Sequence, residues 1–256
     1  MTTGYLGMFP IDSQLATIWC TSYILVFSEI TVPSLTVENY IKAIYQISEQ
    51  QDKKPVTTGQ LASTLGVAPG TVTSMLKTLN TAGLAMHTPY EGVSLSRTGQ
   101  VLALRMIRRH RLIEQFLVQT LSMNWDEVHD EAEHMEHAVS DLLVDRIDEY
   151  LGRPEVDPHG DPIPRGTTGS DSEHINKYQP LSTLPMGVSF RVTRVLDQSP
   201  VFLRYLAETG LILGSSGHVE ETKSPTGVFY VRVNNAMVAL AIDAASNLLV
   251  EELASP

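Results

Sequence analysis

The sequence lacks the features of a secreted or membrane-spanning protein. Its single cysteine, Cys20, excludes an internal disulfide framework and fits a reducing compartment. No lysine or arginine precedes Lys42, so the basic start of a secretory signal is missing. An apolar run near the start, Leu15–Phe27, has 13 residues, whereas a helix needs about 20 to cross a bilayer. We therefore expect a cytoplasmic protein without membrane contact, in which residues 1–35 form an extension of unknown role.

Positive charge is also scarce, but it is unevenly distributed. The whole chain has a net charge of −11, which by itself argues against nucleic-acid binding. Residues 36–110, however, carry eight Lys/Arg against four Asp/Glu, whereas residues 111–256 carry ten against 23. A mildly basic front part joined to a strongly acidic remainder indicates a polyanionic partner for the front part.

The basic part has the pattern of a winged helix-turn-helix. A helix is predicted over 37–50 with Thr36 as its cap, and a second begins at the capping-box pair Thr57 and Gln60. A third helix follows from about Pro69 to Gly83, and LAMHTPYEGVSLS alternates like a hairpin. In this fold the second helix of the pair enters the major groove of DNA.

Small and hydroxyl-bearing residues at the start of that helix allow a close approach to base edges. The absence of Arg, Asn or Gln there indicates that DNA shape contributes to recognition. The predicted DNA-contacting residues are Pro69, Gly70, Thr71, Thr73, Ser74, Lys77 and Arg97, with Arg105, Arg108 and Arg109 as further phosphate contacts. The alternative is a helix-turn-helix that serves as a scaffold or contacts protein.

The remaining sequence predicts helices followed by a small β domain. A long amphipathic helix follows the hairpin, and another extends from the pair Asn124 and Glu127 to Leu151. Residues 153–186 have the Pro, Gly, Ser and Asp content of a linker. Short β-like runs over 188–253, interrupted by VFLRYLAETG, predict a small β-barrel with one helical turn.

The stretch HDEAEHMEH, residues 129–137, holds three histidines and four acids but no lysine or arginine. Residues three and four apart share a helix face, so Glu133, Glu136 and His137 converge. His110 and Glu114 form a similar pair on the preceding helix. Two facing helices thus offer six donors: His110, Glu114, His129, Glu133, Glu136 and His137.

Carboxylate oxygens and imidazole nitrogens without thiolate favour Mn²⁺ or Fe²⁺, with Zn²⁺ as a competitor. A bound cation would also remove the repulsion among the acids. The alternative is a solvated acidic helix with incidental histidines. We assign a surface position to Asp130, Glu131 and His134, and no metal role to His87, His159, His174 and His218.

The combination of VENYIKAIY, TVTSMLKTLNTAGL, RRHRLIEQFL, VHDEAEHMEH, HGDPIP and FLRYLAETGL resembles the diphtheria-toxin-repressor family of iron- or manganese-dependent transcriptional regulators. The resemblance covers residues 36 to the end. It implies a mainly α fold with a small β part: a winged-helix DNA-binding domain (36–104), a helical dimerisation and metal-binding domain (105–152), the linker (153–186) and an SH3-like domain (187–256).

The resemblance also implies two metal sites. The primary, activating site would consist of Asn39, Glu133, Glu136 and His137, and the ancillary site of His110, Glu114 and His129. Iron-responsive members have Cys in place of Glu133 and Met in place of Asn39, whereas manganese-responsive members have Glu and Asp. Asp197 and Gln198 are further candidate ligands from the SH3-like domain.

The implied protein is a homodimeric repressor that Mn²⁺ activates to bind a palindromic operator of metal-ion homeostasis genes, with Fe²⁺ as an alternative and Zn²⁺ or Co²⁺ as substitutes. An iron-responsive or an activating regulator is the closest alternative. A di-metal carboxylate enzyme is a remote one, because the chain has Glu-x-x-His only at Glu131 and His134 and lacks H-E-x-x-H. A metal-buffering or adaptor protein is a third.

Overall fold

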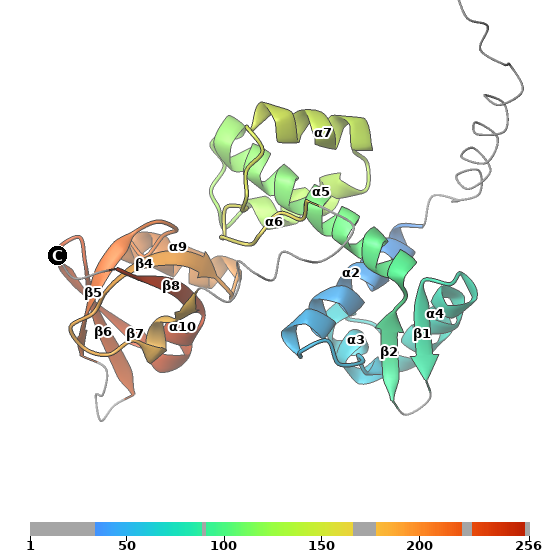
Figure 1. Cartoon of the computed structure of the whole chain (residues 1–256), viewed down its shortest axis with the longest axis horizontal. Coiled ribbons are helices and arrows are strands. Elements are labelled where there is room, and N and C mark those ends of the chain that lie inside the picture. The colour runs from blue at the N-terminus through green and yellow to red at the C-terminus, as the bar shows by residue number, and fades with distance from the viewer. Residues whose placement is uncertain (1–33, 89–90, 166–177, 222–226, 254–256) are drawn as a thin grey trace, which may run out of the picture.

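The computed structural model describes residues 34–88, 91–165, 178–221 and 227–253. The apolar run Leu15–Phe27 and residues 166–177 of the predicted linker lie outside the described residues. Three parts follow one another along the chain: a blue-to-teal module ending in a hairpin, a green-to-yellow helical part, and an orange-to-red β domain (Figure 1). Within the described residues, no helix has the length and apolar character that crossing a membrane requires.

The first part is a winged helix-turn-helix, as predicted. It consists of α2 (Leu35–Gln50), α3 (Thr58–Leu65), α4 (Pro69–Thr81), β1 (Ala85–Thr88) and β2 (Gly92–Leu95). The capping box of Thr57 and Gln60 is present, and Gly66 ends α3 in the left-handed conformation with φ 64°. The predicted cap of α2 was wrong. Ser34 caps it, because the helix begins one residue earlier than Thr36 and the Ser34 hydroxyl accepts from the amide of Val37 at 3.4 Å.

The helix α4 is held by one face and exposed on the other. Val72, Leu76 and Leu79 are fully buried and pack in one core with Ile41 and Ile44 of α2. The opposite face, which includes every residue predicted to contact bases, is exposed. The apolar spacing of α4 therefore leaves its small and hydroxyl-bearing side chains free to meet a partner.

A single long helix, α5 (Arg97–Leu121), links the winged-helix module to the second part (Figure 1). Ser96 caps α5, and Gly99 lets its first turn lie directly on the hairpin, since a Cβ at this position would collide with the carbonyl of Leu84. Because α5 continues without a break, the side chains in its middle are rigidly connected to the DNA-binding module.

The prediction of one helix from 124 to 151 was wrong. The structure has two, α6 (Val128–Glu136) and α7 (Asp141–Tyr150). The Ser140 hydroxyl accepts from the amide of Leu143 at 3.3 Å and starts α7 afresh. Asn124 and Glu127 do pair at 3.1 Å, but in the turn before α6.

Residues 153–165 are packed, although their composition predicted a linker. Ile163 and His159 are buried, and Arg111 of α5 donates to the carbonyl of Pro162 at 2.5 Å. Gly160 has φ +87°, and a Cβ there would collide with the carbonyl of Thr193. The glycine and prolines thus form a tight segment that the β domain contacts, and composition alone does not distinguish this from a linker.

The third part is a six-stranded antiparallel sheet with the strand order β3-β8-β4-β5-β6-β7. Its elements are β3 (Gln179–Pro180), η1 (Leu181–Thr183), β4 (Ser189–Val195), α9 (Pro200–Thr209), β5 (Ser216–Glu221), β6 (Val228–Val233), β7 (Ala236–Ala241), α10 (Ile242–Ser246) and β8 (Leu248–Leu253). The helix α9 corresponds to the predicted helical piece, whereas the short α10 was missed. Trp125, before α6, packs against the core of this domain.

Candidate metal centre

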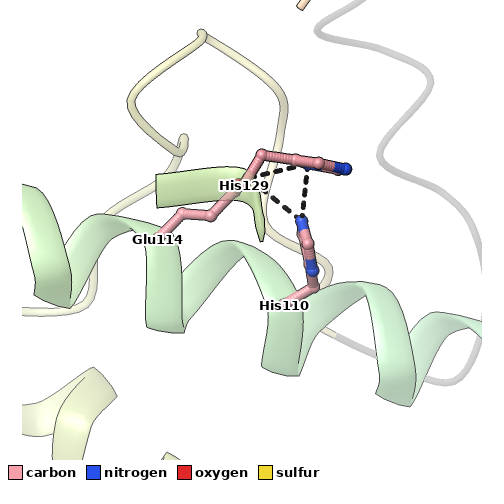
Figure 2. Close-up of side chains that lie close together, drawn as sticks. All are labelled: His110, Glu114 and His129. Carbon is pink, nitrogen blue, oxygen red and sulfur yellow. Dashed lines mark hydrogen bonds and ion pairs between the residues drawn. The ribbon is translucent and has the colours of Figure 1, made fainter. Parts of the chain in front are cut away.

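Three side chains from α5 and α6 form what we call the histidine cluster: His110, Glu114 and His129 (Figure 2). His110 Nε2 lies 3.0 Å from Glu114 Oε1 and 3.3 Å from His129 Nδ1. His129 Nδ1 is also 3.3 Å from Glu114 Oε1. The predicted ancillary residues therefore point toward one another, with His110 and Glu114 buried and His129 more exposed.

On the other side of the His110 ring lies what we call the lysine cluster: Lys42, His110, Glu133 and Glu136. Lys42 Nζ is 2.6 Å from Glu133 Oε1 and 3.0 Å from Glu136 Oε2. It is also 3.2 Å from His110 Nδ1, and that nitrogen is 2.8 Å from Glu136 Oε2. Lys42, on α2, thus connects the DNA-binding module to α6. Sequence reasoning missed Lys42, whose signal was a charged residue within the apolar stripe of α2.

The other two predicted primary residues lie beside the lysine cluster. His137 Nε2 is 3.5 Å from Glu136 Oε1, and its Nδ1 is 2.8 Å from Oε2 of Glu38 on α2. Asn39 has a buried Oδ1 with no hydrogen-bond partner. Of the predicted primary acids and histidine, only Glu133 and Glu136 belong to one compact group of donor atoms among the described residues, and His110 completes that group.

Electrostatics favour a charged His110. Burial opposes the charged ring, but its hydrogen bonds to the Glu114 and Glu136 carboxylates outweigh burial and raise the pKa of His110 to about 9. Burial likewise opposes the charged form of Glu136, yet His110 and Lys42 hold its pKa below the usual value. At neutral pH the ring therefore donates from both nitrogens, one to each carboxylate.

A third group, the loop cluster, consists of Glu114, Asp157 and His159 and was not predicted. His159 Nε2 is 2.8 Å from the carbonyl of Trp125, so this nitrogen donates. Its Nδ1 is buried without a hydrogen-bond partner and lies 3.9 Å from Glu114 Oε2. The prediction that His159 lacks partners at metal spacing was wrong, because the packed 153–165 segment brings it to Glu114.

Burial raises the pKa of Asp157 well above its usual value, and the charges of Asp161 and Glu114 add to the increase. Asp161 shows the opposite behaviour, since Arg111 and Arg194 overcome its burial and lower its pKa. Gln198, a predicted ligand, donates to Asp161 Oδ2 at 3.1 Å, and Asp197 accepts from the amide of Ser199. Asp197 belongs to no compact group of His, Cys, Asp and Glu donor atoms among the described residues.

The basic residues of α5 divide into two sets. Arg97 is exposed, as is Lys77 on α4. Arg105 pairs with Asp141, and Arg108 pairs with Asp148 at 2.8 Å. Arg109 is buried and donates to the carbonyl of Glu136 at 2.9 Å and to Asp141 at 2.7 Å. All three arginines therefore pair with acids of the helical part, and Arg109 also holds the end of α6. Their contact with phosphate stays a prediction.

Three family models match consecutive parts of the chain. They describe the N-terminal DNA-binding domain of iron-dependent repressors (residues 34–93), the metal-binding and dimerisation domain of the same proteins (96–165) and the FeoA domain (179–252). The iron-dependent repressor IdeR of Mycobacterium leprae is 28% identical over 228 residues, covering 85% of this chain and 97% of IdeR. The diphtheria toxin repressor of Corynebacterium efficiens is 28% identical over 226 residues, covering 85% and 96%.

Among solved structures, a manganese-dependent transcriptional repressor in complex with manganese is 38% identical, with a TM-score of 0.73. The match covers 85% of this chain and all of that one. Fold and site together define a DNA-binding transcriptional regulator with a metal-binding and dimerisation domain. The chain belongs to the family of metal-dependent repressors that includes the diphtheria toxin repressor and IdeR. The predicted regulator is therefore confirmed and the di-metal enzyme is not supported.

Proposed function

We propose that this repressor is activated by Mn²⁺ and that a primary site made by Asn39, Glu133, Glu136 and His137 senses the ion. The observation that carries the proposal is the meeting of α2 with α6. Lys42 of α2 already contacts Glu133 and Glu136 of α6, and Glu38 of α2 contacts His137, which directly follows α6. A ligand held between these helices therefore acts on the position of the DNA-binding module.

The donor set suits the ion. Carboxylate and amide oxygens with imidazole, and no thiolate, match the preference of Mn²⁺ more closely than that of softer ions, while Fe²⁺, Zn²⁺ and Co²⁺ remain able to bind. The buried Asn39 Oδ1 is an acceptor without a partner on the α2 side. A divalent ion there would supply the positive charge that joins the α6 carboxylates to this oxygen. An iron-responsive regulator is the alternative, and its test is the same titration with Fe²⁺ in place of Mn²⁺.

We propose that a second ion is held by the ancillary residues His110, Glu114 and His129. Glu114 is the member to which both histidines bind. The loop cluster offers a second arrangement around the same carboxylate, because the buried Nδ1 of His159 lies 3.9 Å from Glu114 Oε2, whereas His110 and His129 contact Oε1. Asp197 and Gln198 of the β domain are not needed for either arrangement.

We propose that α4 enters the major groove of double-stranded promoter DNA. Its exposed face carries the predicted DNA-contacting residues Pro69, Gly70, Thr71, Thr73, Ser74 and Lys77, and Arg97 adds a phosphate contact. Two copies joined by residues 105–152 would present two such helices to a palindromic operator with half-sites about 34 Å apart. With this assignment we propose three domains: a winged-helix DNA-binding domain (36–104), a helical dimerisation and metal-binding domain (105–152) and an SH3-like domain (187–256). We propose that the regulator acts in the cytoplasm, on genes of metal-ion homeostasis.

The test is a titration of Mn²⁺ into the protein with a palindromic promoter fragment, followed by fluorescence anisotropy. We expect DNA affinity to rise with Mn²⁺ and to fall again with chelator. Glu136→Ala should lose the response, and so should the half-exposed Glu133→Gln, which is less disruptive to folding. Glu131→Gln, on an exposed position of the same helix, is the matched control. An affinity unchanged by Mn²⁺, or a full response in Glu136→Ala, would contradict the proposal.

A further inference from the structure

Lys42 is a buried lysine whose ammonium lies among potential metal ligands. Only 6% of the residue is exposed. Its Nζ contacts Glu133 Oε1 at 2.6 Å and both oxygens of Glu136 at 3.0 and 3.1 Å. Together with His110, these carboxylates form the compact donor group on the α2 side of α5. An internal cation therefore already occupies the position between the acids.

We propose that Lys42 is a built-in competitor for the primary metal ion and sets the metal concentration at which this repressor binds DNA. The inference rests on the proposed function, because it takes the ion to bind at Glu133 and Glu136. It adds a residue that is not a ligand but determines how tightly the ligands hold the ion.

Displacement follows from geometry. A divalent transition metal binds carboxylate oxygen at roughly 2.0–2.2 Å, and the Lys42 ammonium is hydrogen-bonded to the same oxygens. An ammonium has three donors and no lone pair, so it cannot join the coordination sphere. A divalent ion bound to these oxygens would lie close to the Lys42 ammonium, and the two positive charges repel each other, so we expect Lys42 to withdraw when the ion enters.

The Lys42 side chain can move, and an alternative carboxylate partner lies within the same helix. Its four-carbon stem is flexible, and Glu38 lies one turn earlier on the same face of α2. Glu38 now binds His137 Nδ1 at 2.8 Å, so its carboxylate is already next to the site. Withdrawal nonetheless breaks three close contacts, and this cost weakens metal binding relative to the same ligands without a lysine.

The experiment compares the wild type with Lys42→Met, whose unbranched side chain is one atom shorter than that of lysine and carries no charge. Free Mn²⁺ is followed by electron paramagnetic resonance, and DNA binding by anisotropy over the same Mn²⁺ range. We expect Lys42→Met to bind Mn²⁺ at least tenfold more tightly and to reach half-maximal DNA binding at a correspondingly lower Mn²⁺ concentration. Lys42→Arg, which retains a competing cation, should not gain this affinity.

Lys54→Met is the matched control, since it removes the same charge from an exposed turn after α2. Its Mn²⁺ affinity should stay near that of the wild type. Circular dichroism and thermal unfolding in chelator verify that each variant is folded. Loss of the ammonium leaves the carboxylates uncompensated, so Mn²⁺ should raise the midpoint temperature of Lys42→Met more than that of the wild type.

The outcomes separate this inference from the proposed function. If the wild type binds DNA in response to Mn²⁺ but Lys42→Met has the same or weaker Mn²⁺ affinity, Lys42 is not a competitor and the function stands. If only Lys42→Met binds Mn²⁺, the competition is real and the proposed activation of the natural chain is wrong. If neither protein binds Mn²⁺, both proposals are overturned.

Discussion

The lysine cluster and the histidine cluster share the His110 ring but balance their negative charge in different ways. In the lysine cluster the ammonium of Lys42 lies between Glu133 and Glu136. In the histidine cluster the positive charge is the extra proton of His110, held beside Glu114. An incoming metal ion can replace a proton on a ring nitrogen without moving the side chain, whereas it can replace Lys42 only by displacing the whole side chain. The two halves of the site should therefore differ in affinity and in their response to pH.

The largest effect is expected from Glu114, which belongs to both the histidine cluster and the loop cluster. Glu114→Gln should weaken metal binding on this side by more than about 100-fold, because loss of an outer-shell partner alone costs about 10–100-fold. The primary site should keep its ion. Isothermal titration with Mn²⁺ and Zn²⁺ measures the change as a fall from two bound ions per chain to one.

Glu131→Gln is the control for Glu114→Gln, because Glu131 is exposed and belongs to none of the three clusters. It should bind both ions as the wild type does. A Glu114→Gln protein that still binds two ions tightly would mean that the histidine cluster is not a metal site, and the contrast between the two clusters would lose its basis.

The next effect concerns the proton of His110. Its pKa in the folded protein, about 9, lies above the ordinary 6.5. The stabilisation is therefore complete below pH 6.5 and is lost as the pH rises to about 9. The shift corresponds to about 3 kcal/mol. Denaturant unfolding in chelator at pH 6, 7.5 and 9.5 should show this decline in the wild type and a flatter profile in His110→Gln. If the two proteins have parallel pH profiles, the His110 ring is neutral and the ammonium of Lys42 is the positive charge that both clusters share.

Much of the fold was predictable from local signals. The capping box at Thr57, the glycine after α3 and the apolar stripe of α4 each act within one helix, so the sequence contains them in full. The break between α6 and α7 was missed, because HAVSD continues the helical spacing and only the Ser140 cap interrupts it. The packing of residues 153–165 was missed because the same prolines and glycines occur in linkers and in tight turns.

The site was predictable where its members share a helix and unpredictable where different elements meet. His110 with Glu114, and Glu133 with Glu136, follow from helical periodicity. Lys42 and His159 do not, since one comes from α2 and the other from the loop before the β domain. The sequence showed an excess of acids in residues 129–137, and we assigned their compensation to a metal ion. The structure adds a lysine from 91 residues away.

A smaller effect is expected at Glu38, which receives a hydrogen bond from His137 Nδ1 and so directs Nε2 toward Glu136. Glu38→Gln should weaken Mn²⁺ binding at the primary site about tenfold, as loss of an orienting partner does at other metal sites. The Zn²⁺ affinity of the histidine cluster should be unchanged. Competition titrations with a fluorescent chelator measure both, and Glu49→Gln, exposed near the end of α2, is the control. Equal weakening at both clusters would show that they are not independent.

The smallest effect is expected at Asp157. It tests whether a bound proton offsets negative charge in the loop cluster, as the proton of His110 does in the histidine cluster. Burial and neighbouring acids raise the pKa of Asp157 well above its usual value. A raised carboxyl pKa means that stability falls as the pH rises above the unfolded value of 3.8, until the folded carboxyl ionises. An amide removes this penalty, and its oxygen can still accept from the amides of His159 and Asp161, as Oδ1 does at 2.8 and 2.9 Å.

Asp157→Asn should therefore change the free energy of unfolding in chelator by less than about 1 kcal/mol at neutral pH, or raise it slightly. Asp161→Asn, in the same segment, should be clearly destabilising, because that carboxylate is charged and binds Arg111 and Arg194. Urea unfolding of the two variants measures the difference. If Asp157→Asn proves as damaging as Asp161→Asn, Asp157 is ionised and Arg111, whose Nε lies 3.6 Å from it, is its partner. The guanidinium of Arg111 would then balance the negative charge of the loop cluster, as the ammonium of Lys42 does in the lysine cluster. A metal ion at the loop cluster would have to compete with that arginine.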